Sequence, residues 1–299
     1  MILNRTHINI DHSGRELPEK GMQLFYLYAN EGNIHEYVAG CIPSHWHNAL
    51  EIFVLLHGSV QIGINDQIYI LTPGEGCFIN SNVLHSFTAI TDEPCLYRSF
   101  VFESNIVSGT PGSIFDAKYV RPLMEKGPAF IRFTDTDDNK DYFSNFDKTF
   151  DLCVNEPYGY EFETRDYLSK IVLFIKDKAR LEQLSKIPER QDLRIKQMLE
   201  WIERNIDKAI TVSEIAESVN ICVRECQRIF NKYMHYSPME YVRRKRIFMA
   251  ADKIVGTDTP ITDIAIECGF SSHSHFTRQF RELVGETPTA YRASHAPKL

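Results

Sequence analysis

The heptapeptide HWHNALE (45–51) carries two imidazoles and one carboxylate. Imidazole nitrogens and carboxylate oxygens bind divalent transition metals, and they also hydrogen-bond sugars and other polar ligands inside barrels. If the segment is a strand, His45 and His47 point to the same face, and Glu51, four residues on, shares that face. The sequence therefore predicts a polar cluster that holds a polar effector, holds a metal ion, or has a purely structural role.

The segments around this heptapeptide have the pattern of β-strands. LEIFVLL (50–56) is continuously apolar, as in a strand buried on both faces. Apolar residues alternate over 60–64 and again at Ile68 and Ile70, and Asn65-Asp66 between them supplies a turn, which predicts a hairpin. Many short strands with frequent turns up to about residue 102 predict a sandwich or a small barrel.

From about residue 140 the apolar period becomes helical. The segment 163–182 carries an apolar stripe that we expect either to form a dimer contact or to pack on the barrel. KIPERQD (186–192) is polar and contains a proline, so we expect a linker there, between an N-terminal domain (1–185) and a C-terminal domain (193–299).

Composition limits the class of protein. The chain has 299 residues, no apolar run near the ~18 needed to span a bilayer, and no apolar core at its start that would make a signal peptide. Its seven cysteines lack tight metal spacing and suit reduced thiols, so we expect a cytoplasmic protein. The net charge is −7, but residues 188–299 carry 17 Lys/Arg against 15 Asp/Glu, so the second half is far less acidic than the first.

The C-terminal segment contains an internal repeat. EIAESVN-ICVRECQRIF (214–230) matches DIAIECGFSSHSHFTRQF (263–280), with one residue inserted after Asn220/Gly269. In each copy a small alanine lets two helices cross closely, and Asn220 or Gly269 takes a left-handed turn position. Cys222 or Ser272 then opens a second helix. Each copy is therefore a predicted helix-turn-helix unit, at about 211–233 and 260–283.

The two units are joined by one predicted helix over 237–255. Its length of about 27 Å is comparable with the ~34 Å between successive major-groove faces of DNA. Two reading helices held apart by this rod could enter adjacent grooves on one side of a duplex. The stripe expected to pack inward consists of Tyr241, Phe248, Ala251 and Val255.

With these motifs, residues 194–293 resemble the DNA-binding domain of the AraC family of bacterial transcription regulators. The segment GFSSHSHFTRQFRELVGETPTAYR near the end is the most specific part of the resemblance. Cys222 and Asn220 depart from the usual Ser and Gly. In that family the second helix of each unit reads bases, and the matching positions are Arg224, Gln227, Arg228, His273, Ser274 and Arg278.

The first half resembles the cupin-like barrels that sense small molecules in many members of the family. Gly40, His45-x-His47-x3-Glu51 and Gly58 resemble the first cupin motif, and Pro73 to His85 resembles the second. In metal-binding cupins the four residues matching His45, His47, Glu51 and His85 hold iron, zinc, manganese or nickel. Here we expect these four to bind an effector, and we predict neither a bound metal nor a cofactor.

The resulting expectation is a two-domain regulator and not an enzyme. An N-terminal all-β cupin-like barrel with appended helices would bind a small-molecule effector, with a carbohydrate as the first guess from the resemblance. A C-terminal all-α domain with two helix-turn-helix units would bind a double-stranded DNA operator as a homodimer and activate transcription, with RNA polymerase as a candidate partner. The alternatives are a metal-dependent cupin enzyme and a regulator that senses the metal itself.

Overall fold

The computed structural model describes residues 2–3, 25–182 and 190–295. This part of the chain divides into two compact units, one containing the strands and one that runs from Arg190 to the C-terminal helices. None of its helices is both long and apolar enough to cross a lipid bilayer. All seven cysteines lie in the described part, and none of them forms a disulfide.

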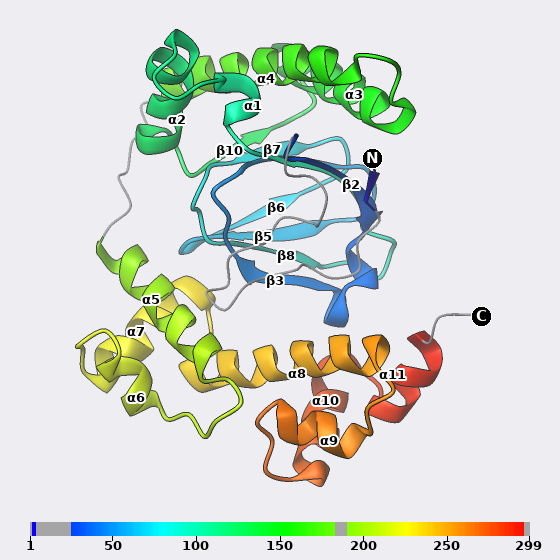
Figure 1. Cartoon of the computed structure of the whole chain (residues 1–299), viewed down its shortest axis with the longest axis vertical. Coiled ribbons are helices and arrows are strands. Elements are labelled where there is room, and N and C mark those ends of the chain that lie inside the picture. Colours follow the sequence, from blue (N-terminus) through cyan, green and yellow to red (C-terminus); the bar gives the residue numbers. More distant parts are fainter. Residues whose placement is uncertain (1, 4–24, 183–189, 296–299) are drawn as a thin grey trace. The chain divides into compact units, whose positions relative to one another are not determined.

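The first unit contains two sheets (Figure 1). The six-stranded sheet has the order β1-β2-β9-β4-β7-β10, and the four-stranded sheet has the order β3-β8-β5-β6. The strands of the first sheet are β1 (Ile2–Leu3), β2 (Leu27–Asn33), β4 (Leu50–Leu55), β7 (Gly76–Ile79), β9 (Leu96–Phe102) and β10 (Phe130–Phe133). Those of the second are β3 (Cys41–His45), β5 (Val60–Ile64), β6 (Gln67–Leu71) and β8 (His85–Ala89).

Helices cover the outer face of the six-stranded sheet, with α3 and α4 lying across it (Figure 1). Every residue of β4 is buried, as its continuous apolar sequence predicts. Leu50, Ile52 and Val54 face the helices, whereas Phe53 stacks on Phe87 of the other sheet. The helical elements of this unit are η1 (Ile34–Glu36), α1 (Asn105–Ser108), the π-helical turn η3 (Asp116–Val120), α2 (Arg121–Lys126), η4 (Asp137–Asn139), α3 (Lys140–Asn155) and α4 (Tyr160–Glu182).

The predicted hairpin over β5 and β6 is confirmed, but Ile68 and Ile70 do not face the core. Each is 47% exposed. The cause is the register, which pairs buried Ile62 with Tyr69 and buried Val60 with Leu71. Directly opposed residues of an antiparallel pair share one face, so the two isoleucines point to the other face of an edge strand.

The apolar stripe of α4 packs within its own unit. Leu168, Ile171, Val172 and Ile175 belong to the core that α3 and α4 form with the six-stranded sheet. Of the two expectations for this segment, packing therefore accounts for the stripe.

The second unit is helical and is organised around the long helix α8. This helix contacts both helix-turn-helix units, α6–α7 and α9–α10, and also α11. The helices are α5 (Arg190–Arg204), α6 (Val212–Glu217), α7 (Val223–Met234), α8 (Pro238–Gly256), α9 (Ile261–Glu267), α10 (His273–Val284) and α11 (Pro288–His295). One further helical turn, η2 (Val38–Gly40), lies earlier in the chain, directly before β3. Of the predicted linker, residues 186–189 lie outside the described residues, and residues 190–192 are already helical.

The stripe predicted for the connecting helix is wrong in part. Tyr241 and Ala251 are buried, but Val255 is 38% exposed, while Ile247 and Ile254 are buried. Because α8 is covered by helices of both helix-turn-helix units and by α11, its buried surface is wider than one narrow stripe. The predicted fold class is confirmed: a β-rich unit with two sheets and appended helices, and a helical unit with two helix-turn-helix motifs joined by one helix.

Candidate ligand cluster and DNA-reading surface

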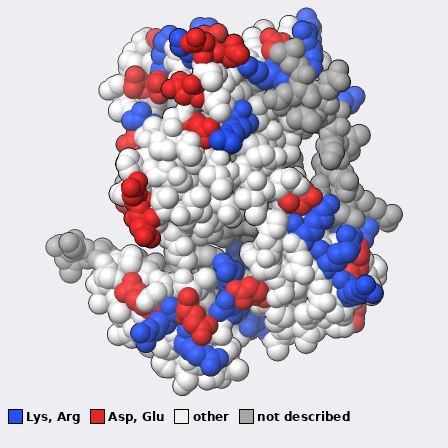
Figure 2. Space-filling model, turned by 180° about the vertical axis from the view of Figure 1, so that it is seen from behind, with Lys and Arg blue, Asp and Glu red and all other residues white. Residues whose placement is uncertain are grey.

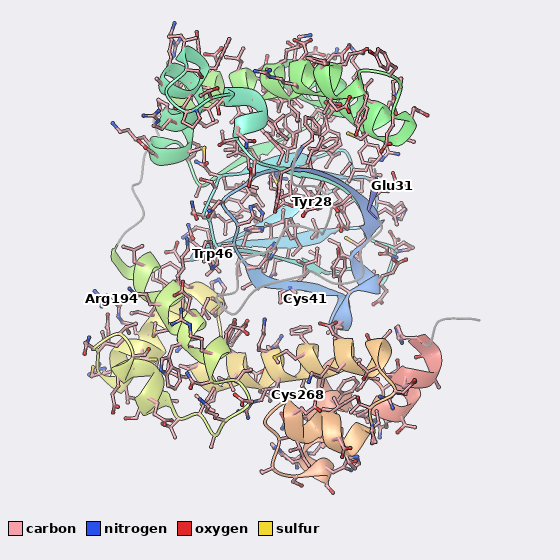
Figure 3. The ribbon with its side chains drawn as sticks, viewed as in Figure 1. Tyr28, Glu31, Cys41, Trp46, Arg194 and Cys268 are labelled. Carbon is pink, nitrogen blue, oxygen red and sulfur yellow. The ribbon has the colours of Figure 1, made fainter. Side chains whose placement is uncertain are left out.

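His45, His47, Glu51 and His85 form one cluster inside the β-rich unit. Their potential ligand atoms all lie within 4.8 Å of one another, and all four residues are buried. His45 ends β3, His47 lies in the connection that follows, and Glu51 belongs to β4 in the other sheet. The grouping predicted from the sequence is correct, but the expectation that His45, His47 and Glu51 share one face of a single strand is wrong, because β3 and β4 belong to different sheets. Trp46, between the two histidines, is half-buried; its position is labelled in Figure 3.

Hydrogen bonds fix the tautomer of each imidazole in the cluster. Nδ1 lies 2.9 Å from the Pro43 carbonyl oxygen in His45 and 3.0 Å from that of Ala49 in His47. In His85 it lies 2.8 Å from the carbonyl oxygen of Val83. A carbonyl oxygen can only accept, so each Nδ1 carries the proton, and Nε2 of a neutral ring presents a lone pair.

The Nε2 atoms of His47 and His85 face the carboxylate of Glu51. Glu51 Oε2 lies 3.3 Å from His47 Nε2 and 3.1 Å from His85 Nε2. Neutral rings would bring lone pairs against a carboxylate oxygen at these distances. Either protons on the rings or a bound cation must therefore compensate the charge of Glu51.

The electrostatics of the cluster follow from its burial. Desolvation and the neighbouring rings of His85 and His47 hold the pKa of His45 well below its usual value, which favours a neutral ring. Burial alone would raise the pKa of Glu51, but hydrogen bonds from His47 and His85 outweigh it and lower that pKa. The cluster therefore holds a carboxylate anion next to at least one neutral imidazole.

The turns of both helix-turn-helix units adopt the predicted left-handed conformation. Asn220 has φ 56° and Gly269 has φ 79°. Thr211 and Glu214 form a capping box at the start of α6. Ser272 caps α10 through a hydrogen bond from the backbone of His275, whereas Cys222 begins α7 without a side-chain cap.

The candidate reading residues of the first unit lie on one exposed surface of α7. Arg224, Gln227 and Arg228 are exposed, and the helix buries Cys226, Phe230 and neighbouring apolar residues instead. The guanidinium of Arg228 donates two hydrogen bonds of 2.8 Å to the carboxylate of Glu225. Arg194 of α5 (Figure 3) lies 3.6 Å from the same carboxylate.

The candidate reading residues of the second unit surround a surface hollow of about 650 Å³. His273, Ser274 and Arg278 line it together with Arg281. Helix α10 is held on α8 by Arg243, whose guanidinium donates a 2.8 Å hydrogen bond to Gln279. The structure thus presents three candidates on each reading helix to solvent.

Sequence reasoning missed the carboxylate partner of Arg228. Glu225 precedes it by three residues, and this spacing on a helix was a readable sign of the pair. Basic and acidic side chains are interspersed over the face of the helical unit in Figure 2. Net charge alone would therefore have been a poor guide to the reading surface.

Comparison with known proteins assigns both halves of the chain. Residues 39–137 match a family described as an AraC-like ligand binding domain, and residues 215–294 match one described as a helix-turn-helix domain. The chain is 25% identical to the uncharacterized HTH-type transcriptional regulator YdeC of Bacillus subtilis (strain 168), over 95% of this chain and 97% of YdeC.

Two further relatives carry functional names. The HTH-type transcriptional activator RhaS of Klebsiella pneumoniae (strain 342) is 25% identical over 84% of this chain and 87% of RhaS. The regulatory protein SoxS of Salmonella typhimurium (strain LT2) is 34% identical over 98 residues, which cover 33% of this chain and 92% of SoxS. These relatives are regulators and not enzymes, so the alternative of a metal-dependent enzyme is set aside. The chain belongs to the AraC family of transcriptional regulators and joins a ligand-binding domain to a DNA-binding helix-turn-helix domain.

Proposed function

We propose that this regulator activates transcription in the cytoplasm from an operator that it reads with α7 and α10, in response to an effector bound in its β-rich unit. Two exposed reading helices on one rigid connecting helix carry the proposal. The printed name of RhaS, an activator, supports the sign of regulation. The protein acts as a homodimer on repeated half-sites, and an activator bound there can contact RNA polymerase.

We assign the reading of bases to six exposed residues of α7 and α10. Arginine pairs bidentately with guanine, and glutamine pairs with adenine. Arg228 and Arg278, which are 51% and 67% exposed, have the length and charge for guanine or phosphate. Gln227 suits adenine. The residues assigned to DNA contact are Arg224, Gln227, Arg228, His273, Ser274 and Arg278.

Effector recognition is assigned to the cluster of His45, His47, Glu51 and His85. Three imidazoles and a carboxylate can hydrogen-bond several hydroxyl groups, so a carbohydrate is the effector class that matches them. All four residues are at most 5% exposed, and a sugar would reach them only when the barrel opens. Such an opening would couple effector binding to a shift between two states of the regulator.

A second candidate is a regulator that senses a divalent transition-metal ion at the same cluster. The observation that favours it is the convergence of Nε2 lone pairs on a buried carboxylate. Three imidazole nitrogens and one carboxylate oxygen suit zinc or another first-row metal, and the atoms already lie within 4.8 Å of one another. A single ion needs far less opening of the barrel than a sugar does.

One experiment separates the two candidates. Operator duplexes are selected from a random library with the purified protein, and affinity is then measured by fluorescence anisotropy with a panel of sugars and with zinc, iron, manganese and nickel. An effector should change the operator Kd about 5- to 150-fold in the wild type and not in Glu51→Gln. Metal content of protein purified without chelator or histidine tag is measured by elemental mass spectrometry.

The matched controls are His47→Ala inside the cluster and His57→Ala, an exposed histidine outside it. About one metal ion per wild-type and His57→Ala chain, and none per His47→Ala chain, would establish the metal sensor. Absence of metal after addition of all four ions rejects it. Failure of every sugar and metal to change operator affinity rejects the cluster as the effector site.

A further inference from the structure

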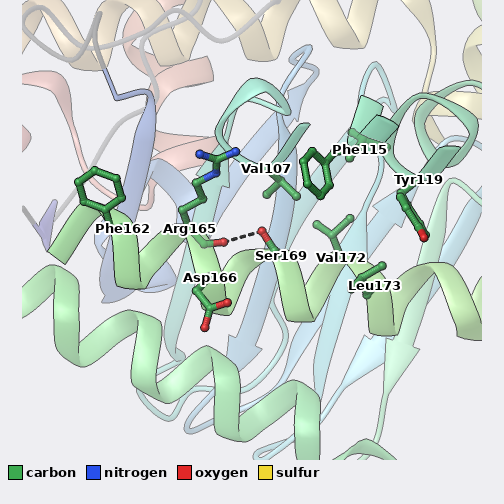
Figure 4. A pocket seen from close by; sticks show the side chains of 10 residues that line it. Val107, Phe115, Tyr119, Phe162, Arg165, Asp166, Ser169, Val172 and Leu173 are labelled. Carbon is green, nitrogen blue, oxygen red and sulfur yellow. Dashed lines mark hydrogen bonds between the residues drawn. The ribbon is translucent and has the colours of Figure 1, made fainter. Parts of the chain in front are cut away.

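A separate cavity of about 440 Å³ lies on the helical layer of the β-rich unit, between α1, η3 and α4 (Figure 4). None of its lining residues belongs to the histidine cluster. Its volume falls in the range of small-molecule pockets, about 300–1,000 Å³. The apolar lining consists of Val107, Phe115, Tyr119, Val120, Phe162, Val172 and Leu173.

The rim of this cavity exposes large apolar side chains. Phe162 is 79% exposed, Phe115 is 55% exposed and Leu173 is 46% exposed, whereas Val107 and Val120 are buried. Large apolar side chains gathered around a hollow mark a binding surface, because a solvated phenyl ring gains free energy when it is covered. The walls therefore suit the apolar body of a ligand.

One cationic side chain, that of Arg165, lies beside the apolar walls of the cavity. The Arg165 side chain forms no ion pair or hydrogen bond with any residue in the described part of the chain, and only its backbone carbonyl accepts a hydrogen bond, from Ser169. The neighbouring Asp166 is paired with Lys170 at 2.7 Å. Figure 4 shows the side chains of Arg165 and Asp166 pointing in opposite directions from α4.

We propose that this cavity binds a monocarboxylic acid with an apolar body. The guanidinium of Arg165 pairs with the carboxylate, and Val107, Phe115, Phe162 and Leu173 contact the hydrocarbon. Arginine matches the planar carboxylate with two parallel N–H donors. A phosphate or dicarboxylate would bring a second negative charge, and Arg165 is the only cationic residue in the lining.

The position of the cavity on α4 suits a site at which a ligand regulates the protein. Helix α4 packs on the six-stranded sheet through its buried stripe and is the last helix that the structure describes in the β-rich unit. A ligand that fixes the outer surface of α4 can therefore bias the segment that follows α4 in the chain. This inference does not depend on what the histidine cluster binds.

The test uses the full-length protein and two probes of equal length, octanoate and the neutral octanamide, in isothermal titration calorimetry. Octanoate should bind the wild type at least about ten-fold more tightly than octanamide. Arg165→Gln should remove this preference. The matched control Arg180→Gln, an exposed arginine on the same helix outside the cavity, should retain it.

Phe162→Ala should weaken both probes, because both use the apolar wall. Glu51→Gln should leave octanoate binding unchanged, which separates this site from the cluster. The proposal is overturned if octanoate does not bind the wild type, or if Arg165→Gln and Arg180→Gln bind it equally. Self-association that is lost in Phe162→Glu, without any octanoate binding, would instead make this face a contact between two copies of the chain.

Discussion

Replacement of Arg228 by alanine should separate folding from DNA reading. In the free protein its guanidinium pairs with Glu225 through two hydrogen bonds of 2.8 Å, and the Arg228 side chain is 51% exposed. Exposed ion pairs contribute at most about 1 kcal/mol. Arg228→Ala should therefore lower the free energy of unfolding by less than about 1 kcal/mol.

The expected effect on the operator is larger. A bidentate arginine–guanine contact contributes about 1–3 kcal/mol, which corresponds to a rise of about 5- to 150-fold in Kd. If Arg228 instead holds a phosphate, the loss should be similar for all sequences, and the slope of log K against log salt should shrink by about 0.9. Comparison of selected and scrambled duplexes at several salt concentrations distinguishes the two contacts.

The assay is fluorescence anisotropy with a selected operator, accompanied by urea unfolding of the same preparation. Arg204→Ala is the matched control, because Arg204 lies on α5, is 68% exposed and is 3.9 Å from a carboxylate of Glu200. Both variants lose one positive charge. If Arg228→Ala and Arg204→Ala bind the operator with the same affinity and salt slope, Arg228 is not a reading residue.

Three further predictions concern the framework around these sites. Because Asn220 has φ 56°, Asn220→Val should lower the free energy of unfolding by about 1 kcal/mol or more while Asn220→Gly does not, and equal urea midpoints for the two would contradict this. Lys245→Met should cost about 3–5 kcal/mol, since it removes the ammonium that lies 2.6 Å from the buried carboxylate of Glu203 and breaks a buried ion pair. The double variant Lys245→Met with Glu203→Leu should recover most of that loss in urea unfolding, and a double variant no more stable than the single would contradict this. Burial alone would raise the pKa of Glu75, but hydrogen bonds, including those from Arg132, lower it below the ordinary 4.5. Because the pKa of Glu75 is lower in the folded than in the unfolded chain, its carboxylate stabilises the fold above pH 4.5, and this stabilisation is lost as the pH falls through the folded pKa. Glu75→Gln should therefore lower the Tm at pH 7 by more than it lowers it at pH 3, and a Tm difference independent of pH would refute this.

Local patterns predicted much of the helical unit. The matched positions of the repeat, the left-handed turns at Asn220 and Gly269 and the capping box at Thr211 were all readable, because each depends on residues within a few positions of one another. The same holds for the exposure of Arg228 and Arg278, which follows from the helical period around buried Phe230 and Phe280.

Long-range packing decided the rest. Ile68 and Ile70 alternate as the pattern requires, yet only the pairing with β5 determines that they face away from the core. The buried surface of α8 is wide because helices distant in sequence surround it. These outcomes depend on partners that no local window contains.

The histidine cluster shows both contributions. The sequence by itself determined which side chains could bind a ligand, because imidazole and carboxylate chemistry belongs to the residue types of His45, His47, Glu51 and His85. Only the tertiary structure decided how they meet, since β3 and β8 belong to one sheet and β4 to the other. It also brought Arg165 of α4 beside Phe115 and Val107, fifty or more residues earlier in the chain, and thereby formed a cavity that no spacing predicts. Contacts between distant segments depend on the packing of whole sheets and helices, and residue type and spacing specify only the local part of that packing.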